Sequence, residues 1–548
     1  MLRTLLIGLI ILLSYKSQSQ DPNSETDRIT TFCKVWGFFK YYHPEVTAKK
    51  MKWDDEFRAQ LKQLDSLNTK KEINKFYSKW LKSLGGVKAC KECNNNVADS
   101  LKINLDLTWM NDSISFEKEV IKQLHYIEKN RNQDTKSYIS EGAPEQGPEW
   151  KEKGYYDSIM PSRELRLLGL ARYWNIINYF FPYKNIIGED WNNVLVDMIP
   201  KFINANDTVA YRYAVLELIA RINDTHAMPF GHQSEYYGTK FIPFTIKIID
   251  NKPIVTGFKN DSLAKIDDIQ YGDVFLKINN IEIDTLINQK LKYIPASNMP
   301  AKLRNLSKVI LNGDSDMIEV TYDRNGTVNT KMIHRYYYEE LKYIPREHAD
   351  TAVWKIVETN IGYVNMGNLK KNDVMDVIVR LKNTQAIIFD LRNHPNGTQR
   401  DLSLLLNHEK LPFAKFTLLD LKYPGVISYT EPIMCGSNTN YYYQGTVVIL
   451  VDENTQSHGE FTCMALQTAP KVKVIGSQTA GADGNVSMIV FPGGIETYMS
   501  GIGVFYPDGK ETQRVGIVPE VAVTRTIEGI RAQRDEAFEL AIEIIKNY

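Results

Sequence analysis

The sequence predicts a multidomain α+β protein with a duplicated helical region at its amino terminus, a small β-rich module and a carboxy-terminal α/β core. At 548 residues the chain is longer than one hydrophobic core usually organises. A pattern of Arg, Trp and Pro recurs in its first half, and apolar strand-like runs alternate with helical segments beyond residue 352. An aromatic content of 11%, with 31 Tyr, favours well-filled cores over disorder.

The overall charge of the chain is balanced. Lys plus Arg number 66 and Asp plus Glu number 66, so the formal net charge is zero. No global electrostatic field therefore favours nucleic acid or an anionic membrane surface. We expect no nucleic-acid partner and only local recognition.

The first twenty residues have the pattern of an export signal. Met1 to Arg3 carries a positive charge, residues 5–13 form an apolar run, and residues 17–20 are small or polar. The apolar run is shorter than the roughly 20 residues of a spanning helix, which makes an uncleaved anchor the less favoured alternative. We expect an exported protein, periplasmic or extracellular, with no integral membrane segment once the signal is cleaved.

The amino-terminal half contains an internal repeat. Each residue of one set recurs 138 positions later: Arg28, Trp36, Pro44 and Trp53 recur as Arg166, Trp174, Pro182 and Trp191. Apolar residues three and four apart in both copies predict two related helical bundles. We assign them to residues 21–129 and 161–235, joined by a linker at 130–160 that is rich in Gly, Pro and charge.

The ends of the two copies differ. The second copy has Asp224 and His226 at the positions where the first has Gly86 and Lys88. Polar residues have thus been placed at the exit of a predicted helix in the second copy alone.

A lone C-x-x-C motif lies between the first copy and the linker. No second such motif or nearby pair of histidines accompanies Cys90 and Cys93, which disfavours half a zinc site. A redox dithiol is another possible interpretation of Cys90 and Cys93. We favour a local disulfide or two unpaired thiols.

Residues 241–335 change to short strands separated by Asn, Asp and Gly turns. Within them, Gly272-Asp273 before an apolar strand and the turn Ile278-Asn279-Asn280 resemble a PDZ domain. That resemblance implies that a peptide carboxy terminus adds as a strand to the sheet edge. On composition alone a generic β-domain is as good an interpretation.

Strand and helix patterns alternate over residues 352–548, which predicts a largely parallel sheet with functional residues at the strand carboxyl ends. Ser457 lies at such an end, in the turn between the apolar strand VILVD and a helical segment. Helix-start N–H groups converge at a turn of this kind and can hold an oxyanion. Ser457 is therefore the best candidate nucleophile.

Three segments of this core resemble the C-terminal processing (tail-specific) and tricorn-type serine peptidases. They are AIIFDLRNHPNG, VDENTQSHGE, and IGSQTAGADG followed by VGIVPEVAV. The resemblance implies a ClpP/crotonase-like core and a serine-type peptidase, with Ser457 as the nucleophile. It implies no cofactor and no metal, and the sequence contains no H-E-x-x-H or phosphate-binding glycine motif.

A serine hydroxyl needs a base to accept its proton. Processing members of the family use a lysine, but Ala482 stands near its place and no lysine lies between Lys473 and Lys510. Tricorn-type members use a histidine from the helical region, which implies His226 as the base. A purely structural histidine is the alternative.

The resemblance also implies an oxyanion site formed by backbone amides. One amide belongs to His458 and another to the turn that contains Asn396 and Gly397, although these residues could form a simple turn without function. Glu460 either orients a catalytic group or caps the helix as part of an S-x-x-E box. Gln513 stands nearest the place of the family's third catalytic group.

The resulting hypothesis is an exported serine endopeptidase that cleaves unstructured or C-terminal protein segments through an acyl-enzyme. Its partners would be protein or peptide substrates, docked by the PDZ-like module. The alternatives are a catalytically inactive protein of the same fold that binds peptides or other ligands, and a scaffold whose helical region does the main work.

Overall fold

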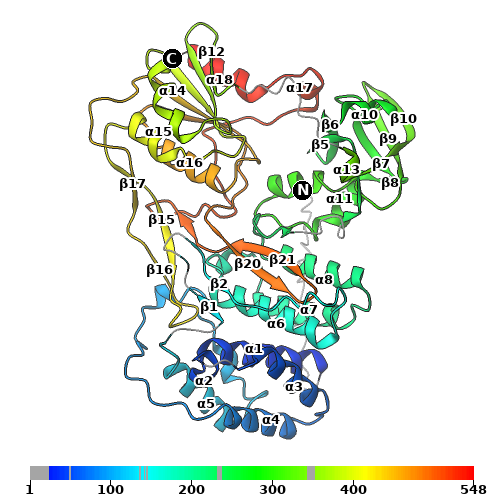
Figure 1. Ribbon diagram of the computed structural model, residues 1–548, viewed down its shortest axis with the longest axis vertical. Helices are drawn as coiled ribbons and strands as arrows, with labels where there is room; N and C mark the ends of the chain where they lie inside the picture. Colours follow the sequence, from blue (N-terminus) through cyan, green and yellow to red (C-terminus); the bar gives the residue numbers. More distant parts are fainter. Residues whose placement is uncertain are drawn as a thin grey trace, which may run out of the picture.

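The computed structural model describes residues 24–48, 51–134, 138–140, 142, 146–230, 237–341 and 352–547. The predicted export signal at residues 1–20 lies outside this part of the chain. Figure 1 shows the helical region at one end of the molecule, the α/β core at the other and the β-rich module beside the core. No helix in the described ranges has both the length and the apolar character needed to cross a membrane.

The helical region follows the predicted repeat. The helices of the first copy are α1 (Glu25–Tyr42), α2 (Pro44–Ala48), α3 (Trp53–Asp65) and α4 (Lys70–Ser83), followed by α5 (Lys118–Lys129). Those of the second copy are α6 (Arg163–Phe180), α7 (Trp191–Ile203) and α8 (Thr208–Ala220). In both copies the long first helix and the next long helix begin at residues that are 138 positions apart in the sequence.

A pair of indole hydrogen bonds recurs in both copies. Trp36 Nε1 donates to the Trp53 carbonyl at 3.2 Å, and Trp53 Nε1 donates back to the Trp36 carbonyl at 3.3 Å. Trp174 and Trp191 form the same reciprocal pair at 2.7 and 3.0 Å. Buried indoles need such partners, so the recurring tryptophans are structural residues that join the first helix of each copy to the next.

The two copies pack into one bundle, whereas the sequence suggested two. Their apolar residues form a single hydrophobic core because α1 and α6 are buried on nearly every side and cover each other. Asn175 of α6 donates to the carbonyls of Cys33 at 3.0 Å and Ala171 at 2.8 Å. Gly37 of α1 lies directly against the Asn175 side chain, so the absence of a side chain at residue 37 permits this close crossing.

The segment expected as a linker is packed where the structure describes it. Two short strands, β1 (Ile139–Ser140) and β2 (Glu149–Trp150), pair antiparallel. Glu152 lies buried between the copies and forms ion pairs with Lys40 and Arg172. Cys90 and Cys93 form a disulfide, the first of the two outcomes favoured for this motif.

The β-rich module is built on a six-stranded antiparallel sheet in the order β10-β9-β7-β6-β5, with β8 on β7. Its strands are β5 (Phe244–Ile249), β6 (Lys252–Phe258), β7 (Val274–Ile278), β8 (Ile281–Glu282), β9 (Met317–Arg324) and β10 (Thr327–His334). Helices α10 (Asp261–Ile266), α11 (Ile283–Leu291) and α12 (Met299–Ser307) accompany the sheet. A small ladder of β4 (Lys240–Phe241) with β11 (Tyr336–Tyr337), then α13 (Tyr338–Leu341), closes the module.

The core contains the predicted parallel sheet. Strands β13 (Ile361–Asn365), β14 (Ala386–Asp390), β18 (Thr446–Val451), β19 (Val472–Gly476) and β23 (Val521–Ala522) run parallel, and β12 (Trp354–Val357) is an antiparallel edge. Helices α14 (Val374–Leu381), α15 (Gln399–Leu406), α16 (His458–Leu466), α17 (Ile527–Arg531) and α18 (Glu536–Lys546) complete it. The sheet thus carries apolar residues on both faces, as continuous apolar strand runs require.

Two groups of antiparallel strands extend from the core to the helical region (Figure 1). One contains β15 (Leu411–Leu419), β16 (Ile427–Tyr429) and β17 (Ile433–Cys435), with β22 (Val504–Phe505) paired to β15. The other is the hairpin of β20 (Val486–Phe491) and β21 (Ile495–Ser500). Strand β3 (Pro229–Phe230), which directly follows the second helical copy, pairs with β21. This pairing brings the end of the helical repeat to the core.

Candidate active site

Ser457 occupies a strained turn between β18 and α16. Its backbone angles are φ 55° and ψ −123°, in a region that non-glycine residues rarely adopt. The Ser457 N–H donates to the Ala482 carbonyl at 2.8 Å, and the Thr455 hydroxyl donates to the Leu391 carbonyl at 2.8 Å. The neighbouring loops therefore hold the serine in this conformation, which is typical of a nucleophile at a strand-to-helix turn.

His226 comes from the turn between α8 and β3. Strand β3 pairs with β21, and the hydroxyl of Thr497 on β21 donates to the Ala227 carbonyl at 3.0 Å. The hydroxyl of Thr225 donates to the Ala480 carbonyl at 3.1 Å. Because Ala480 is two residues before the partner of the Ser457 amide, these contacts place the His226 turn beside the Ser457 turn.

A chain of hydrogen bonds fixes the His226 ring. Its Nδ1 lies 2.9 Å from Ser500 Oγ, and Ser500 Oγ donates to Asp224 Oδ1 at 3.1 Å. The Ser500 amide donates to Asp224 Oδ2 at 2.6 Å, and the His226 amide donates to Asp224 Oδ1 at 3.0 Å. The fully buried Asp224 carboxylate thus connects the backbone and the side chain of the histidine turn to β21.

This chain of contacts selects a tautomer. Since the Ser500 hydroxyl gives its proton to Asp224, it accepts a proton from His226 Nδ1, which leaves Nε2 as the unprotonated nitrogen. Burial lowers the pKa of His226; Asp224 opposes this shift and Arg304 adds to it. The ring is therefore neutral at pH 7 and able to accept a proton.

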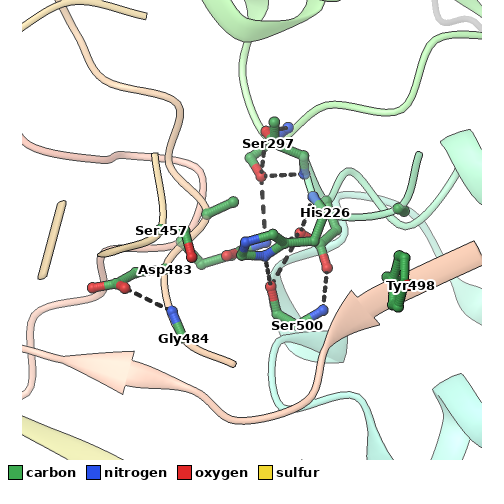
Figure 2. A network of polar contacts seen from close by, with 12 residues as sticks. His226, Ser297, Ser457, Asp483, Gly484, Tyr498 and Ser500 are labelled. Carbon is green, nitrogen blue, oxygen red and sulfur yellow. Dashed lines mark hydrogen bonds and ion pairs between the residues drawn. The ribbon is translucent and has the colours of Figure 1, made fainter. Parts of the chain in front are cut away.

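Ser457 and His226 belong to one cluster, as Figure 2 shows, and Ser500 lies below the ring in this view. Within the described residues no hydrogen bond joins Ser457 Oγ to the His226 ring. The ring is hydrogen-bonded to a side chain through Nδ1, and its partner is Ser500. Catalytic hydrogen bonds in substrate-free enzymes are often long and shorten when substrate binds. The arrangement places a serine hydroxyl and a neutral imidazole in one cluster, without a hydrogen bond between them.

Two backbone amides near Ser457 have no hydrogen-bond acceptor among the described residues. In the described part of the chain the N–H groups of His458 and Gly397 donate to no protein acceptor. The turn of Gly397 lies against the start of α16, since a Cβ built on Gly459 would lie 3.8 Å from Pro395 Cδ. The rings of His394 and His458 are 6.2 Å apart, which also joins these two segments.

Asn396 holds that turn by its side chain. Its Nδ2 donates to the carbonyls of Gly367 at 2.8 Å and Leu369 at 3.1 Å, in the loop after β13. Gly397 follows with φ 69°, a conformation that suits glycine. The Asn396 side chain is therefore an anchor of the turn.

Glu460 organises the loop behind the nucleophile. Its buried carboxylate accepts hydrogen bonds from the amides of Gly481 at 2.8 Å, Ala482 at 3.0 Å and Ser457 at 3.3 Å, and from the Thr479 hydroxyl. Burial raises the pKa of Glu460 to about 6, and these donors limit the rise. Glu460 thus both caps α16 and positions the loop, but it does not contact His226.

Gln513 reaches the histidine turn only indirectly. Its Nε2 lies 3.4 Å from Ser297 Oγ, which accepts from the amide of Thr225 at 2.9 Å. Its Oε1 is buried and has no partner among the described residues. Gln513, the residue nearest the place of the family's third catalytic group, therefore has no hydrogen bond to His226 within the described residues, whereas Asp224 accepts a hydrogen bond from the His226 amide directly.

Sequence reasoning missed two functional candidates. Asp224 was visible as a polar residue where the first repeat copy has glycine, and the D-x-H pattern beside a helix exit was the available signal. Ser500 carried no local signal, because it contacts His226 from 274 positions away. Among the described residues, no group of three His, Cys, Asp or Glu side chains has the geometry of a metal site.

Comparison with known families identifies the core. Residues 360–523, which include Ser457 but not His226, match peptidase family S41. No curated protein sequence matches the chain.

Solved structures are similar over most of the chain. Mature CPAF complexed with lactacystin has a TM-score of 0.56 at 15% identity, covering 70% of this chain and 99% of its own. The photosystem II D1 C-terminal processing protease has a TM-score of 0.39 at 15% identity, covering 69% and 99%. A putative peptidase from Parabacteroides merdae has 0.44 at 14% identity, covering 70% and 97%. Of these, the CPAF comparison alone exceeds 0.5, and at its low identity it supports the fold and nothing finer.

Proposed function

The core of this chain belongs to peptidase family S41, which makes the protein a serine-type peptidase, and we propose that it is an exported endopeptidase that cleaves unstructured or C-terminal segments of proteins. The observation that carries the proposal is the meeting of Ser457, in a strained turn, with His226, whose Nδ1 is fixed by Ser500. The two residues are 231 positions apart in the sequence, and the pairing of β3 with β21 brings their turns together.

In the proposed first step Ser457 Oγ attacks the peptide carbonyl while its proton passes to His226 Nε2. The hydroxyl oxygen bonds to the carbonyl carbon, and the carbonyl oxygen takes the negative charge. His226 then returns the proton to the leaving amine, the C–N bond breaks, and an acyl-enzyme remains. Water, deprotonated by the same ring, hydrolyses the ester and restores Ser457.

Asp224 acts through Ser500 as the group that orients the base. The imidazolium formed in each step keeps its Nδ1 proton toward Ser500, and the Asp224 carboxylate lies 3.7 Å from that nitrogen. A buried anion at this distance stabilises the positive charge that develops on the ring. Asp224 and Ser500 therefore take the role that Gln513, a neutral amide, cannot supply.

The free amides of His458 and Gly397 are the proposed oxyanion donors. They project from the start of α16 and from the turn that Asn396 anchors, so the negative charge would form at the positive end of a helix. One such donor contributes about 3 kcal/mol of transition-state stabilisation.

The β-rich module is proposed to be PDZ-like and to present substrate to this site. Its sheet resembles that family in the residues already named, and its helix α12 contacts the nucleophile loop. Arg304 of α12 donates to the Glu453 carbonyl at 2.6 Å and to Gln456 Oε1 at 2.8 Å, one residue before Ser457. Lys247 of β5 pairs with Glu453 at 2.7 Å. A peptide held by this module would be delivered close to the nucleophile.

Export remains a proposal that rests on the amino-terminal sequence pattern. The Cys90–Cys93 disulfide supports it, because disulfides persist in oxidising compartments. Fractionation of cells that express the full chain, with sequencing of the mature amino terminus, tests it. A protein that stays in the cytoplasm with residues 1–20 intact would contradict it.

A fluorophosphonate probe tests the activity itself, because it labels only an activated serine. We expect labelling of the wild type, no labelling of Ser457→Ala, and cleavage of an unfolded protein such as reduced casein by the wild type alone. The rival function is an inactive binding protein, which the missing bond between Ser457 and His226 favours. If the protein only binds peptides, both the wild type and Ser457→Ala would stay unlabelled and casein would stay intact.

A further inference from the structure

A large cavity opens beside the nucleophile. It has a volume of about 800 Å³, within the range of ligand sites, and both Ser457 and His458 line it. Since the reacting carbonyl must lie against Ser457, a substrate side chain next to the cleaved bond has this cavity within reach.

Aromatic rings form the cavity wall. Phe461 of α16 packs against Phe413 and Phe416 of β15, with ring centroids 4.9 and 5.8 Å apart, and Ile502 and Val504 complete this wall. These side chains suit an apolar or aliphatic segment of substrate, and their ring faces attract cations.

One acidic group lines the same cavity. Asp483 is 2% exposed, its Oδ1 accepts from the Gly484 amide at 2.7 Å, and its Oδ2 has no partner among the described residues. In Figure 2, Asp483 lies on the other side of Ser457 from His226, so the proposed proton transfers do not use it. A buried carboxyl oxygen without a partner costs free energy and calls for a ligand.

The surroundings of Asp483 lack a compensating cation. Burial and the negative charge of Glu460 raise the pKa of the Asp483 carboxyl well above its usual range, and no positive group of the described chain counters them. Arg400 and Lys410 also line the cavity but are exposed, where solvent and salt screen their charge. The inner end of the cavity therefore holds a buried carboxyl that no cation of the described chain compensates, whereas the wall of the cavity is apolar.

We propose that this cavity is the specificity pocket for the residue that supplies the attacked carbonyl, and that it takes Lys or Arg. The aliphatic stem of such a side chain lies along the three phenylalanine rings and its cation meets Asp483. The inference rests on the proposed peptidase activity.

Digestion of an unfolded protein with the full-length enzyme tests the pocket without a known substrate. Reduced casein is digested, and the new termini are read by mass spectrometry. We expect cleavage after Lys and Arg to exceed cleavage after Met and Leu by about tenfold per available residue. A preference for Met and Leu, or for no class, would overturn the inference while leaving the peptidase activity established; the absence of any cleavage would refute the activity.

Asp483→Asn tests the role of the carboxyl. The amide keeps an acceptor for the Gly484 N–H and the size of the side chain, so the pocket is retained. We expect the preference for Lys and Arg over Met and Leu to disappear, because the neutral amide cannot balance the charge of the bound cation. The control is Asp376→Asn, which removes an exposed carboxylate paired with Arg380 and should leave the preference unchanged.

Two peptide aldehydes give a second measurement that tolerates weak turnover. An aldehyde carbon adds to Ser457 Oγ, and the hydroxyl proton moves to the resulting hemiacetal oxygen or to His226. We expect an aldehyde that ends in lysinal to inhibit the wild type about tenfold more strongly than one that ends in norleucinal. Equal inhibition by both aldehydes would contradict the proposed cation site.

Discussion

The imidazole Nδ1 of His226 lies 2.9 Å from Ser500 Oγ, across a sequence separation of 274 positions. The strand pairing of β3 with β21 makes this contact possible, because it places the turn after the second helical copy against the end of a core hairpin. The helical repeat thus reaches the candidate site, because its last turn carries His226, the proposed base.

His226→Ala should lower kcat/KM by about 10²- to 10⁴-fold, the usual contribution of a general base. The side chain lies in a polar cluster and not in an apolar core, so the melting temperature should change little. His458→Ala is the matched control, because only the backbone amide of His458 is assigned a role; it should keep its activity within a few fold. Parallel losses of activity and melting temperature in His226→Ala would indicate a structural histidine instead.

Asp224→Asn should lower kcat and change the pH profile. Asp224 raises the pKa of His226 against the effect of burial. Removing the anion therefore lowers the pKa of the ring further, and the acidic limb of kcat/KM should move to lower pH. Ser500→Ala keeps the negative charge of Asp224 and removes only the Ser500 hydroxyl. It should therefore reduce kcat but move the acidic limb of the kcat/KM profile less than Asp224→Asn does.

The measurement for this pair is kcat/KM from pH 4 to 9, with circular dichroism as a check of folding. If Asp224→Asn reduced activity by the same factor at every pH, the carboxylate would be supporting the turn and not the charge on the ring.

Local features of this protein could be predicted from the sequence. The Ser457 turn was visible because an apolar strand, a polar turn and a helical pattern are contiguous in the chain. The repeat was visible because the same four residue types recur at one spacing. The reciprocal indole hydrogen bonds of the two tryptophans explain why tryptophan is needed at these positions. The parallel order of the core strands followed from their alternation with helices.

Contacts between distant segments could not be predicted in the same way. Hydrophobic periodicity reports which face of an element is buried, but it does not identify the partner that covers it. The sequence therefore gave no sign that Ser500 would meet Asp224, or that α1 and α6 would share one core. The same limit explains Glu460, whose loop partners lie about twenty residues further along the chain.

Glu460 predicts a pH dependence of stability. Its pKa is raised from 4.5 to about 6 in the folded protein, so the favourable contribution of the protonated carboxyl is complete below pH 4.5 and is lost as pH rises through about 6. The shift corresponds to about 2 kcal/mol. The free energy of unfolding of the wild type relative to Glu460→Gln should therefore fall by that amount between pH 4.5 and 7.

Chemical denaturation of both proteins at these two pH values measures the effect. Glu539→Gln is the control, since Glu539 is exposed and pairs with Arg534 on the surface. A difference between wild type and Glu460→Gln that is the same at pH 4.5 and 7 would show that burial does not govern this carboxyl.

Gly37→Ala should destabilise the helical bundle. A Cβ at residue 37 would lie 2.0 Å from the Asn175 side chain, which is itself held by hydrogen bonds to Cys33 and Ala171. The clash forces the two central helices apart, and overpacking of this kind costs about 1–3 kcal/mol. Gly86→Ala is the matched control, because nothing lies within 4 Å of a Cβ at that exposed position.

The double variant Gly37→Ala, Asn175→Ala separates the clash from the loss of backbone freedom. Shortening Asn175 makes room for the new methyl group, so the double variant should be more stable than the sum of the two single changes implies. Thermal unfolding of the four proteins measures this coupling. Strict additivity would mean that the crossing of α1 and α6 does not depend on the contact between residues 37 and 175, and the close packing of the two repeat copies would need another explanation.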